Sequence, residues 1–340
     1  MGISMKGPPV WGLRTVRNKK SEEERSPKGL EEGEKGLSCS QNLFESRGKQ
    51  EDHCQIDHPN PGPDASLSCS EVVTLAVFGQ WNRFPSEQAF YRYAQGHLKG
   101  AFPSLPDRTQ FNRLQRRSRD SIVKFGLHLM EALHGQACLY ELLDSSGVPT
   151  ADAKRREAGW LPGQADIGWS NRMGWYEGFH LLVSINPDGL ITGFGFSSAS
   201  THNHRLAETF FAARAQPIPQ LPSCGAKAVG AYIADKGFAG DGPHAYWKHQ
   251  DGAEVISPPH QRSKVNWSKD WRRWLTGLRQ ILESIYDKLL NTFRLARERP
   301  HDLTGFQARL AAKVSLHNFC IWLNVHLGRD PLAFADLLDW

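Results

Sequence analysis

The chain has 340 residues and a formal net charge of +5, and its length allows one large domain or two ordinary ones. A hydrophobic content of 39% and a charged content of 23% are those of an ordinary globular protein. No apolar run is long enough to cross a bilayer, and the first twenty residues lack the apolar core of a signal peptide, which excludes the membrane-spanning and secreted classes and predicts a cytoplasmic protein without a membrane partner.

The cysteines do not indicate a structural framework. They are scattered at Cys39, Cys54, Cys69, Cys138, Cys224 and Cys320. They form no CxxC pair and no Cys/His cluster at zinc spacing, so neither a disulfide scaffold nor a zinc site is indicated. We expect reduced thiols.

Residues 1–66 differ in composition from the rest of the chain. They are rich in Lys, Glu, Ser, Gly and Pro, with runs such as KKSEEERSPKGLEEGEKG. A segment of this kind cannot bury enough apolar surface to offset the entropy lost on ordering. We therefore predict a disordered leader.

Helical patterning begins near Ser68. Three helices are predicted, in SCSEVVTLAVFGQWNRF, PSEQAFYRYAQGHL and PDRTQFNRLQRRSRDSIVKFGLHLMEAL, because apolar residues recur at helical spacing behind Ser, Pro and Asp start signals. The last of them is strongly basic through Arg113, Arg116 and Arg117. These features predict a helical DNA-binding module over residues 67–135, although plain structural packing would explain the helices equally well.

The pattern then changes to one that alternates strands and helices. ACLYELLDSSG, residues 137–147, predicts a buried strand that ends in a turn, and residues 178–198 predict two strands joined by the hairpin signal Asn-Pro-Asp-Gly. Further elements are predicted as a helix at 202–214, a strand in VGAYIAD, a short strand at 254–256, and long helices at about 268–298 and 304–327. This order predicts an α/β protein with a mixed sheet covered by helices.

Two of the predicted strands end in an aspartate. Asp144 ends LYELLDSSG and Asp235 ends AYIAD before KGFAG. If the strands are neighbours, both carboxylates lie at one rim of the sheet, where oxygen ligands could hold a hard divalent cation such as Mg²⁺. Taken singly, an aspartate in this setting is more often a turn or cap residue.

A third carboxylate stands on the helix DWRRWLTGLRQILESIYDKLLNTF. Its apolar stripe runs from Trp271 to Phe293, and Glu283 lies well off that stripe, with Arg279 one turn earlier on the same face. Glu283 could reach the two aspartates if the helix packs across the sheet. An ordinary exposed Arg–Glu pair at i, i+4 explains the same spacing.

Positive charge is concentrated around this helix. The segment from His260 to Pro300 holds ten basic and four acidic residues, a net +6 that exceeds the net charge of the whole chain. Trp267, Trp271 and Trp274 are interleaved with it. Basic residues mixed with aromatics are typical of nucleic-acid binding, and an amphipathic helix with a solvated cationic face would show the same pattern.

Taken in order, these stretches resemble the DDE transposases of bacterial insertion sequences. The matching stretches are LLDSSGVPT, GWYEGFHLLVSINPDGLITGFGFSSASTHNHRLAE, IADKGFAG and RQILES, while LSCSEVVTLAVFGQWNRFPSEQAFYRY and FPSLPDRTQFNRLQRR resemble the helical N-terminal region of that family. The resemblance covers roughly residues 67–328 and leaves residues 1–66 unexplained. It implies an RNase H-like mixed sheet flanked by helices, as a catalytic domain over residues 136–328, with residues 329–340 as a C-terminal tail.

The resemblance also implies the chemistry. It implies divalent-metal-dependent cleavage at insertion-sequence ends and strand transfer into target DNA, with Asp144, Asp235 and Glu283 as catalytic residues and as ligands of Mg²⁺ or Mn²⁺. The implied partners are the terminal inverted repeats of the element, target DNA and further copies of the chain in a homo-oligomer on DNA, in the nucleoid region of the cytoplasm. DNA contacts are expected from Lys236, Arg272, Arg273, Arg279, Lys288, Arg113, Arg116 and Arg117.

The chain departs from the family pattern at a few positions. Thr276 and Leu290 stand where many relatives have a Tyr and a Lys around the third acid, and His202-Asn203 stands where relatives tend to carry HD. These changes concern auxiliary DNA contacts and leave the three acids in place.

Two other functions fit the same sequence. An RNase H-like nuclease would cut without joining, and terminal inverted repeats flanking the gene would distinguish the two. A degenerate transposase would survive as a DNA-binding protein, and the absence of metal-dependent nicking of end DNA would identify it.

Overall fold

The computed structural model describes residues 66–81, 84–135, 138–151, 161, 164–215, 231–259 and 267–338. The predicted leader lies outside the described residues except for its last position, so its predicted disorder stays a prediction. Within these ranges no helix is long and apolar enough to cross a membrane.

The N-terminal region has four helices in the described part of the chain, where the sequence predicts three. They are α2 (Cys69–Phe78), α3 (Glu87–His97), α4 (Arg108–Arg117) and α5 (Arg119–Ala132). Ser68, Ser86 and Asp107 cap the first three by accepting hydrogen bonds from backbone N–H groups in the first turn. The last predicted helix is divided at Ser118, which ends α4 and precedes α5 without a side-chain cap.

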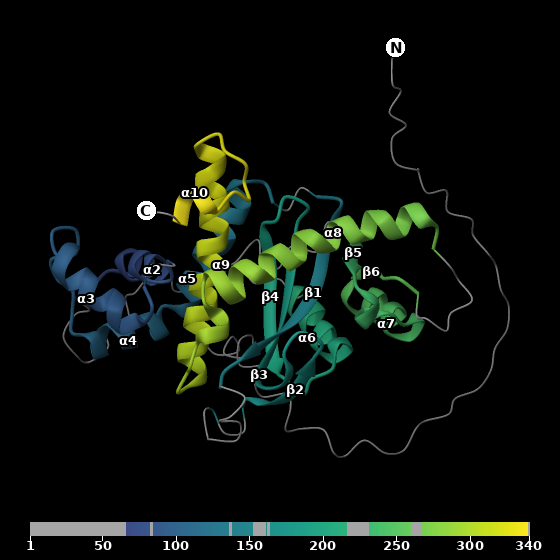
Figure 1. The fold of residues 1–340 in the computed structure, drawn as a ribbon, viewed down its shortest axis with the longest axis horizontal. Helices are drawn as coiled ribbons and strands as arrows, with labels where there is room; N and C mark the ends of the chain where they lie inside the picture. The colour runs from purple at the N-terminus through teal and green to yellow at the C-terminus, as the bar shows by residue number, and fades with distance from the viewer. Residues whose placement is uncertain are drawn as a thin grey trace, which may run out of the picture. The chain divides into compact units, whose positions relative to one another are not determined.

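One mixed sheet forms the centre of the fold (Figure 1). Its strands among the described residues are β1 (Tyr140–Pro149), β2 (Asp166–Ser170), β3 (Gly174–Ile185), β4 (Ile191–Ser198), β5 (Ala231–Ala234) and β6 (Glu254–Ile256). They follow the order β2-β3-β1-β5-β6, and β4 also pairs with β3. The pairings of β1 with β5 and of β5 with β6 are parallel, and the others are antiparallel.

The hairpin of β3 and β4 confirms the Asn-Pro-Asp-Gly prediction. The side chain of Asn186 closes the turn, because its Oδ1 accepts the backbone N–H groups of Asp188 and Leu190 at 3.1 and 2.8 Å. Strand β2 is not among the predicted elements.

Helices cover both faces of the sheet. They are α6 (Asn203–Ala215), α7 (Asp241–Asp251), α8 (Lys269–Asp287), α9 (Leu303–His326) and α10 (Ala335–Leu338). Alternate residues of a strand face opposite sides, so Leu142 of β1 packs in the core with α8 and α9, while Leu143 packs in the core with α6 and α7. This arrangement is the α/β fold of RNase H-like type that the sequence predicts, with a helical region before it.

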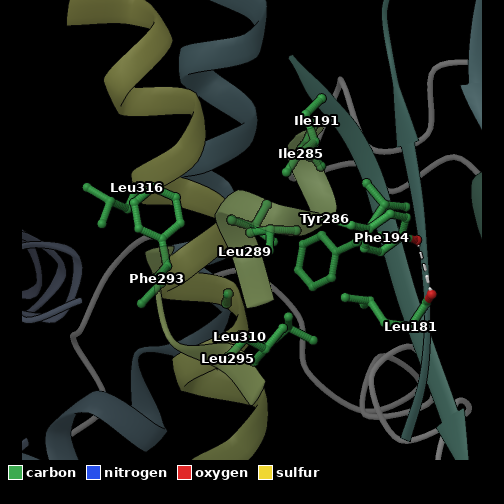
Figure 2. Close-up of a cluster of buried hydrophobic side chains, with 14 of the residues drawn as sticks. Leu181, Ile191, Phe194, Ile285, Tyr286, Leu289, Phe293, Leu295, Leu310 and Leu316 are labelled. Carbon is green, nitrogen blue, oxygen red and sulfur yellow. Dashed lines mark hydrogen bonds between the residues drawn. The ribbon is translucent and has the colours of Figure 1, made fainter. Parts of the chain in front are cut away.

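The end of α8 differs from the prediction of one helix over 268–298. The α-helix ends at Asp287, continues as a π-helical turn (Lys288–Thr292), and is followed by a 3₁₀ turn (Leu295–Arg297). Figure 2 shows the core that this stretch forms with the sheet and α9. Its labelled side chains are Leu181, Ile191, Phe194, Ile285, Tyr286, Leu289, Phe293, Leu295, Leu310 and Leu316.

Two of the N-terminal helices, α2 and α5, contribute side chains to this core. Helix α5 lies along α9 (Figure 1), and a Cβ on Gly126 would come within 2.6 Å of the Ser315 hydroxyl oxygen, so the close approach requires glycine. Across the contact, Ser315 donates to the backbone oxygen of Ile122 at 2.7 Å and Asn318 donates to that of Gly126 at 3.0 Å. The helical region and the sheet are therefore packed as one body through α9.

A buried ion pair lies on the opposite face of the sheet. The side chains of Arg214 on α6 and Glu141 on β1 are only 8% and 2% exposed, and they form a bidentate pair in which Nη2 lies 3.0 Å from Oε1. Arg214 also donates to the Ser184 hydroxyl at 3.1 Å. Removing one partner of such a pair leaves a desolvated charge behind.

Glu141→Gln should therefore lower the free energy of unfolding by about 3–5 kcal/mol, measured by urea or thermal unfolding. The matched control is Glu254→Gln, which breaks the exposed pair of Glu254 and Lys248 at 3.0 Å and should cost less than about 1 kcal/mol. Equal losses in the two variants would contradict the role of burial.

Candidate active site

Asp144 lies inside β1, so the prediction that it ends a strand is wrong. The strand continues to Pro149 because the residues after Asp144 go on pairing with β3, as far as Gly178. The parallel partner is what stops here, since the pairing of β1 with β5 ends at Leu143 and Ala234. Asp144 therefore lies at the point where β1 loses its parallel neighbour β5 and keeps its antiparallel neighbour β3.

Asp235 follows β5 directly, as predicted. It is one position beyond Ala234, so it stands beside Asp144 in the extended register of the two strands. Its Oδ1 accepts the backbone N–H of Gly237 at 2.6 Å and caps a 3₁₀ turn (Lys236–Phe238). A Cβ on Gly237 would lie 2.6 Å from Asn203 Nδ2 and 2.8 Å from Asp235 Oδ1, so a larger residue here would displace these side chains.

The carboxylates interact through space. Burial and then the negative charge of Asp235 raise the pKa of Asp144 to about 7, and Glu283 adds to the rise. The N–H of Ser145, which donates to Asp144 Oδ1 at 2.8 Å, and the charge of Arg279 act in the opposite direction. Because interactions between charges weaken with distance, Asp235, Arg279 and Glu283 lie near Asp144.

A cleft between β1, β5 and α8 brings part of this group together. Asp144, Asp235 and Arg279 line it with apolar side chains from the three elements. Glu283 does not line this cleft and is exposed on α8.

Tyr286 joins α8 to the strand that bears the first acid. Its hydroxyl donates to the backbone oxygen of Asp144 at 2.7 Å and lies 3.2 Å from the backbone oxygen of Leu181 on β3. The sequence patterns do not predict this contact. The available signal was a tyrosine beside the apolar stripe of a helix, because a buried tyrosine hydroxyl usually finds a hydrogen-bond partner.

The donor set fits a hard divalent cation. Asp144, Asp235 and Glu283 offer only carboxylate oxygens, which Mg²⁺ and Mn²⁺ prefer, and a cation would offset the charge that raises the pKa of Asp144. Among the described residues, no group of three or more His, Cys, Asp or Glu side chains is placed to hold a metal ion. The structure thus brings the two aspartates together and leaves Glu283 on the helix beside them.

The predicted DNA-contacting residues of α8 and the Asp235 turn are partly gathered at this site. Arg272, Arg273, Arg279 and Lys236 are exposed. Lys288 points elsewhere: its ammonium donates to the Ser284 hydroxyl at 2.9 Å and lies 5.0 Å from the centre of the Phe334 ring.

The basic residues of α4 form a second exposed group. Arg113, Arg116 and Arg117 are exposed, and Arg116 pairs with Asp302 at 3.2 Å. Helix α4 packs against α2 and α9.

The N-terminal half of α8 differs from its predicted packing. Trp271 and Trp274, which the sequence places on the apolar stripe, are 36% and 38% exposed. They form a ladder with Trp267, with ring centroids 5.9 and 5.1 Å apart along the series. An aromatic surface therefore lies next to the arginines of α8.

Fold and site together define an RNase H-like protein with acids on adjacent central strands. The family model described as a transposase DDE domain matches residues 142–319, more than half of the chain. The chain therefore belongs to the family of transposases that carry this domain, which confirms the resemblance seen in the sequence. No curated protein and no solved structure matches the chain.

The raised pKa of Asp144 predicts a pH-dependent stability. A carboxyl with an ordinary pKa of 3.8 in the unfolded chain and about 7 in the folded protein binds its proton more tightly when folded. Without divalent metal, its contribution is fully present below about pH 4 and is lost as the pH rises through about 7. Thermal unfolding in EDTA between about pH 5 and about pH 8.5 measures this loss.

Asp144→Asn should remove this part of the pH dependence and raise the unfolding temperature above about pH 7. Asp241→Asn, at an exposed position in the first turn of α7, is the control and should leave the slope unchanged. The same slope in wild type and Asp144→Asn would show that Asp144 titrates normally.

Proposed function

We propose that the protein is an active transposase that cleaves DNA at the ends of its element and joins those ends to target DNA, in a reaction that needs Mg²⁺ or Mn²⁺. The observation that carries the proposal is the placement of Asp144 and Asp235, each one residue beyond the last pair of β1 and β5. Burial and then the charge of Asp235 raise the pKa of Asp144. Membership of the DDE transposase family supports it.

Asp144 and Asp235 are the residues that would hold the metal, with Glu283 from α8 completing the set. When bound, the metal supplies charge stabilisation for the attacking and leaving oxygens of the phosphodiester. The backbone N–H groups of Ser145 and Gly237 each donate to Oδ1 of one aspartate and would hold both carboxylates in place for a cation. The nucleophile is water for the nick and a 3′-OH for joining, so no side-chain nucleophile is needed.

The exposed face of α8 would hold the DNA backbone. Arg279 lines the cleft beside the acids, and Arg272 lies close to the same direction on the helix. Arg273 and Lys236 extend the positive surface, and the neighbouring tryptophans suit contact with bases or sugars. The arginines of α4 would contact DNA further from the acids, on the terminal repeats or in a homo-oligomer on DNA.

A protein that only binds DNA is the second candidate. The exposure of Glu283 outside any group of three metal-binding side chains in the described residues favours it. The two candidates differ in whether cleavage occurs, so a nicking assay separates them.

Asp235→Asn should abolish cleavage while the fold and DNA binding persist. Asparagine keeps the cap on Gly237 but removes the charge that would hold the metal, so Mg²⁺-dependent nicking of DNA carrying the element's ends should fall at least about 100-fold. Asp241→Asn is again the charge-matched control and should nick normally. Equal nicking by wild type and Asp235→Asn would contradict the proposal that Asp235 holds a metal.

Arg279→Ala should weaken binding to end DNA and reduce the slope of log Kd against log salt by about 1, because one phosphate contact is lost. Titrations over a range of salt concentrations measure both quantities. Arg329→Ala removes an exposed arginine beyond the end of α9 and serves as the control. An unchanged affinity and slope for Arg279→Ala would mean that Arg279 serves only to offset the acids.

A further inference from the structure

We infer that Tyr286 is a positioning residue: its hydroxyl fixes α8 to β1 at Asp144 and thereby sets where Glu283 stands relative to the aspartates. The inference rests on the proposed function, since it concerns the same three acids. It assigns a role to a side chain that touches neither metal nor DNA in the proposal.

The contact itself is short and buried. The hydroxyl donates to the backbone oxygen of Asp144 at 2.7 Å, and Tyr286 is 4% exposed. Figure 2 shows the ring within the core, with its hydroxyl directed at the backbone oxygen of Leu181, 3.2 Å away. One hydroxyl therefore touches two neighbouring strands of the sheet.

The hydroxyl of Tyr286 stays protonated at neutral pH and therefore remains a hydrogen-bond donor. Burial and then the charge of Asp144 raise the pKa of Tyr286 well above its ordinary value.

The remaining buried contacts of α8 are not directional in this way. Leu275, Leu282 and Ile285 are its other buried side chains, and apolar packing alone tolerates small rotations and shifts of a helix. A hydrogen bond weakens steeply when its angle or length changes. Among the buried side chains of α8, Tyr286 is thus the one whose hydrogen bond fixes the rotation of the helix about its own axis.

Glu283 responds directly to that rotation. It lies three residues before Tyr286, which places the two side chains on neighbouring sides of the helix with Cα positions about 4.5 Å apart along its axis. The backbone oxygen of Asp144 accepts the hydrogen bond from Tyr286, and the carboxylate of the same residue is repelled by the charge of Glu283. Moving the backbone of Glu283 relative to that of Asp144 requires breaking or bending this bond.

Other polar contacts near this end of α8 provide a weaker link. Arg172, in the turn between β2 and β3, approaches Asp287 at 3.9 Å, but both side chains are more than half exposed. Surface pairs of this kind hold a helix loosely.

The test is Tyr286→Phe in the full chain, which keeps the ring and removes the hydroxyl. Loss of one directed contact should raise the Kd for Mn²⁺, measured by calorimetry without DNA, about tenfold, and should raise the Mg²⁺ concentration for half-maximal nicking similarly. Affinity for end DNA should stay unchanged. Tyr91→Phe is the matched control: that tyrosine is 6% exposed, and its hydroxyl donates to the backbone oxygen of Pro106 in the N-terminal region.

A double-mutant comparison separates positioning from general stability. In a Glu283→Gln background, Tyr286→Phe should change the Kd for Mn²⁺ less than about twofold, because the ligand that it positions is already gone. The inference is overturned if Tyr286→Phe keeps wild-type metal affinity, if its effect is equal in both backgrounds, or if it fails to unfold cooperatively where Tyr91→Phe does. A wild-type protein that neither binds Mn²⁺ nor nicks DNA would instead overturn the proposed function.

Discussion

Mutual repulsion between two acidic side chains is a strain that the packing around them has to withstand. Asp144 and Asp235 stand beside each other at the edge where β5 ends, and burial and mutual charge raise the pKa of Asp144 to about 7. An unfavourable arrangement of this kind persists only where surrounding packing holds it in place. That packing comes from cores on both faces of the sheet, with α8 and α9 on one side and α6 and α7 on the other.

Strand β1 carries two acids whose charges the protein compensates to different degrees. Glu141 faces α6 and is matched by the guanidinium of Arg214, so its charge is compensated inside the protein. Asp144, three residues later, faces α8 and has the Ser145 N–H and the more distant charge of Arg279 to offset burial and its acidic neighbours. The same strand thus carries one acid whose charge is paired and one whose charge is only partly offset by the protein.

The sequence predicts best what depends on neighbouring residues. The Asn-Pro-Asp-Gly turn, the strand at 254–256 and the end of β5 at Asp235 follow from local turn chemistry and short apolar runs, and the structure confirms them. The aspartate pair could be predicted as well, because each acid follows a short apolar run in the sequence. The division of a predicted helix at Ser118 was not foreseen, since both sides of it have helical composition.

What could not be predicted depends on distant partners. Asp144 looks like the end of a strand because Ser145, Ser146 and Gly147 are poor strand formers, yet pairing with β3 carries the strand through them. The exposure of Trp271 and Trp274 likewise depends on what packs against α8, which periodicity does not report.

We propose above that Asp144 and Asp235 hold a divalent metal. The most direct measurement is anomalous diffraction from crystals of the protein containing Mn²⁺. If they hold a metal, an anomalous peak is expected within about 2.0–2.3 Å of a carboxylate oxygen of each aspartate, with Glu283 as the further acidic ligand, in the coordination range of a hard cation. Crystals that bind Mn²⁺ elsewhere, or that show no peak between the two aspartates at saturating Mn²⁺, would contradict it.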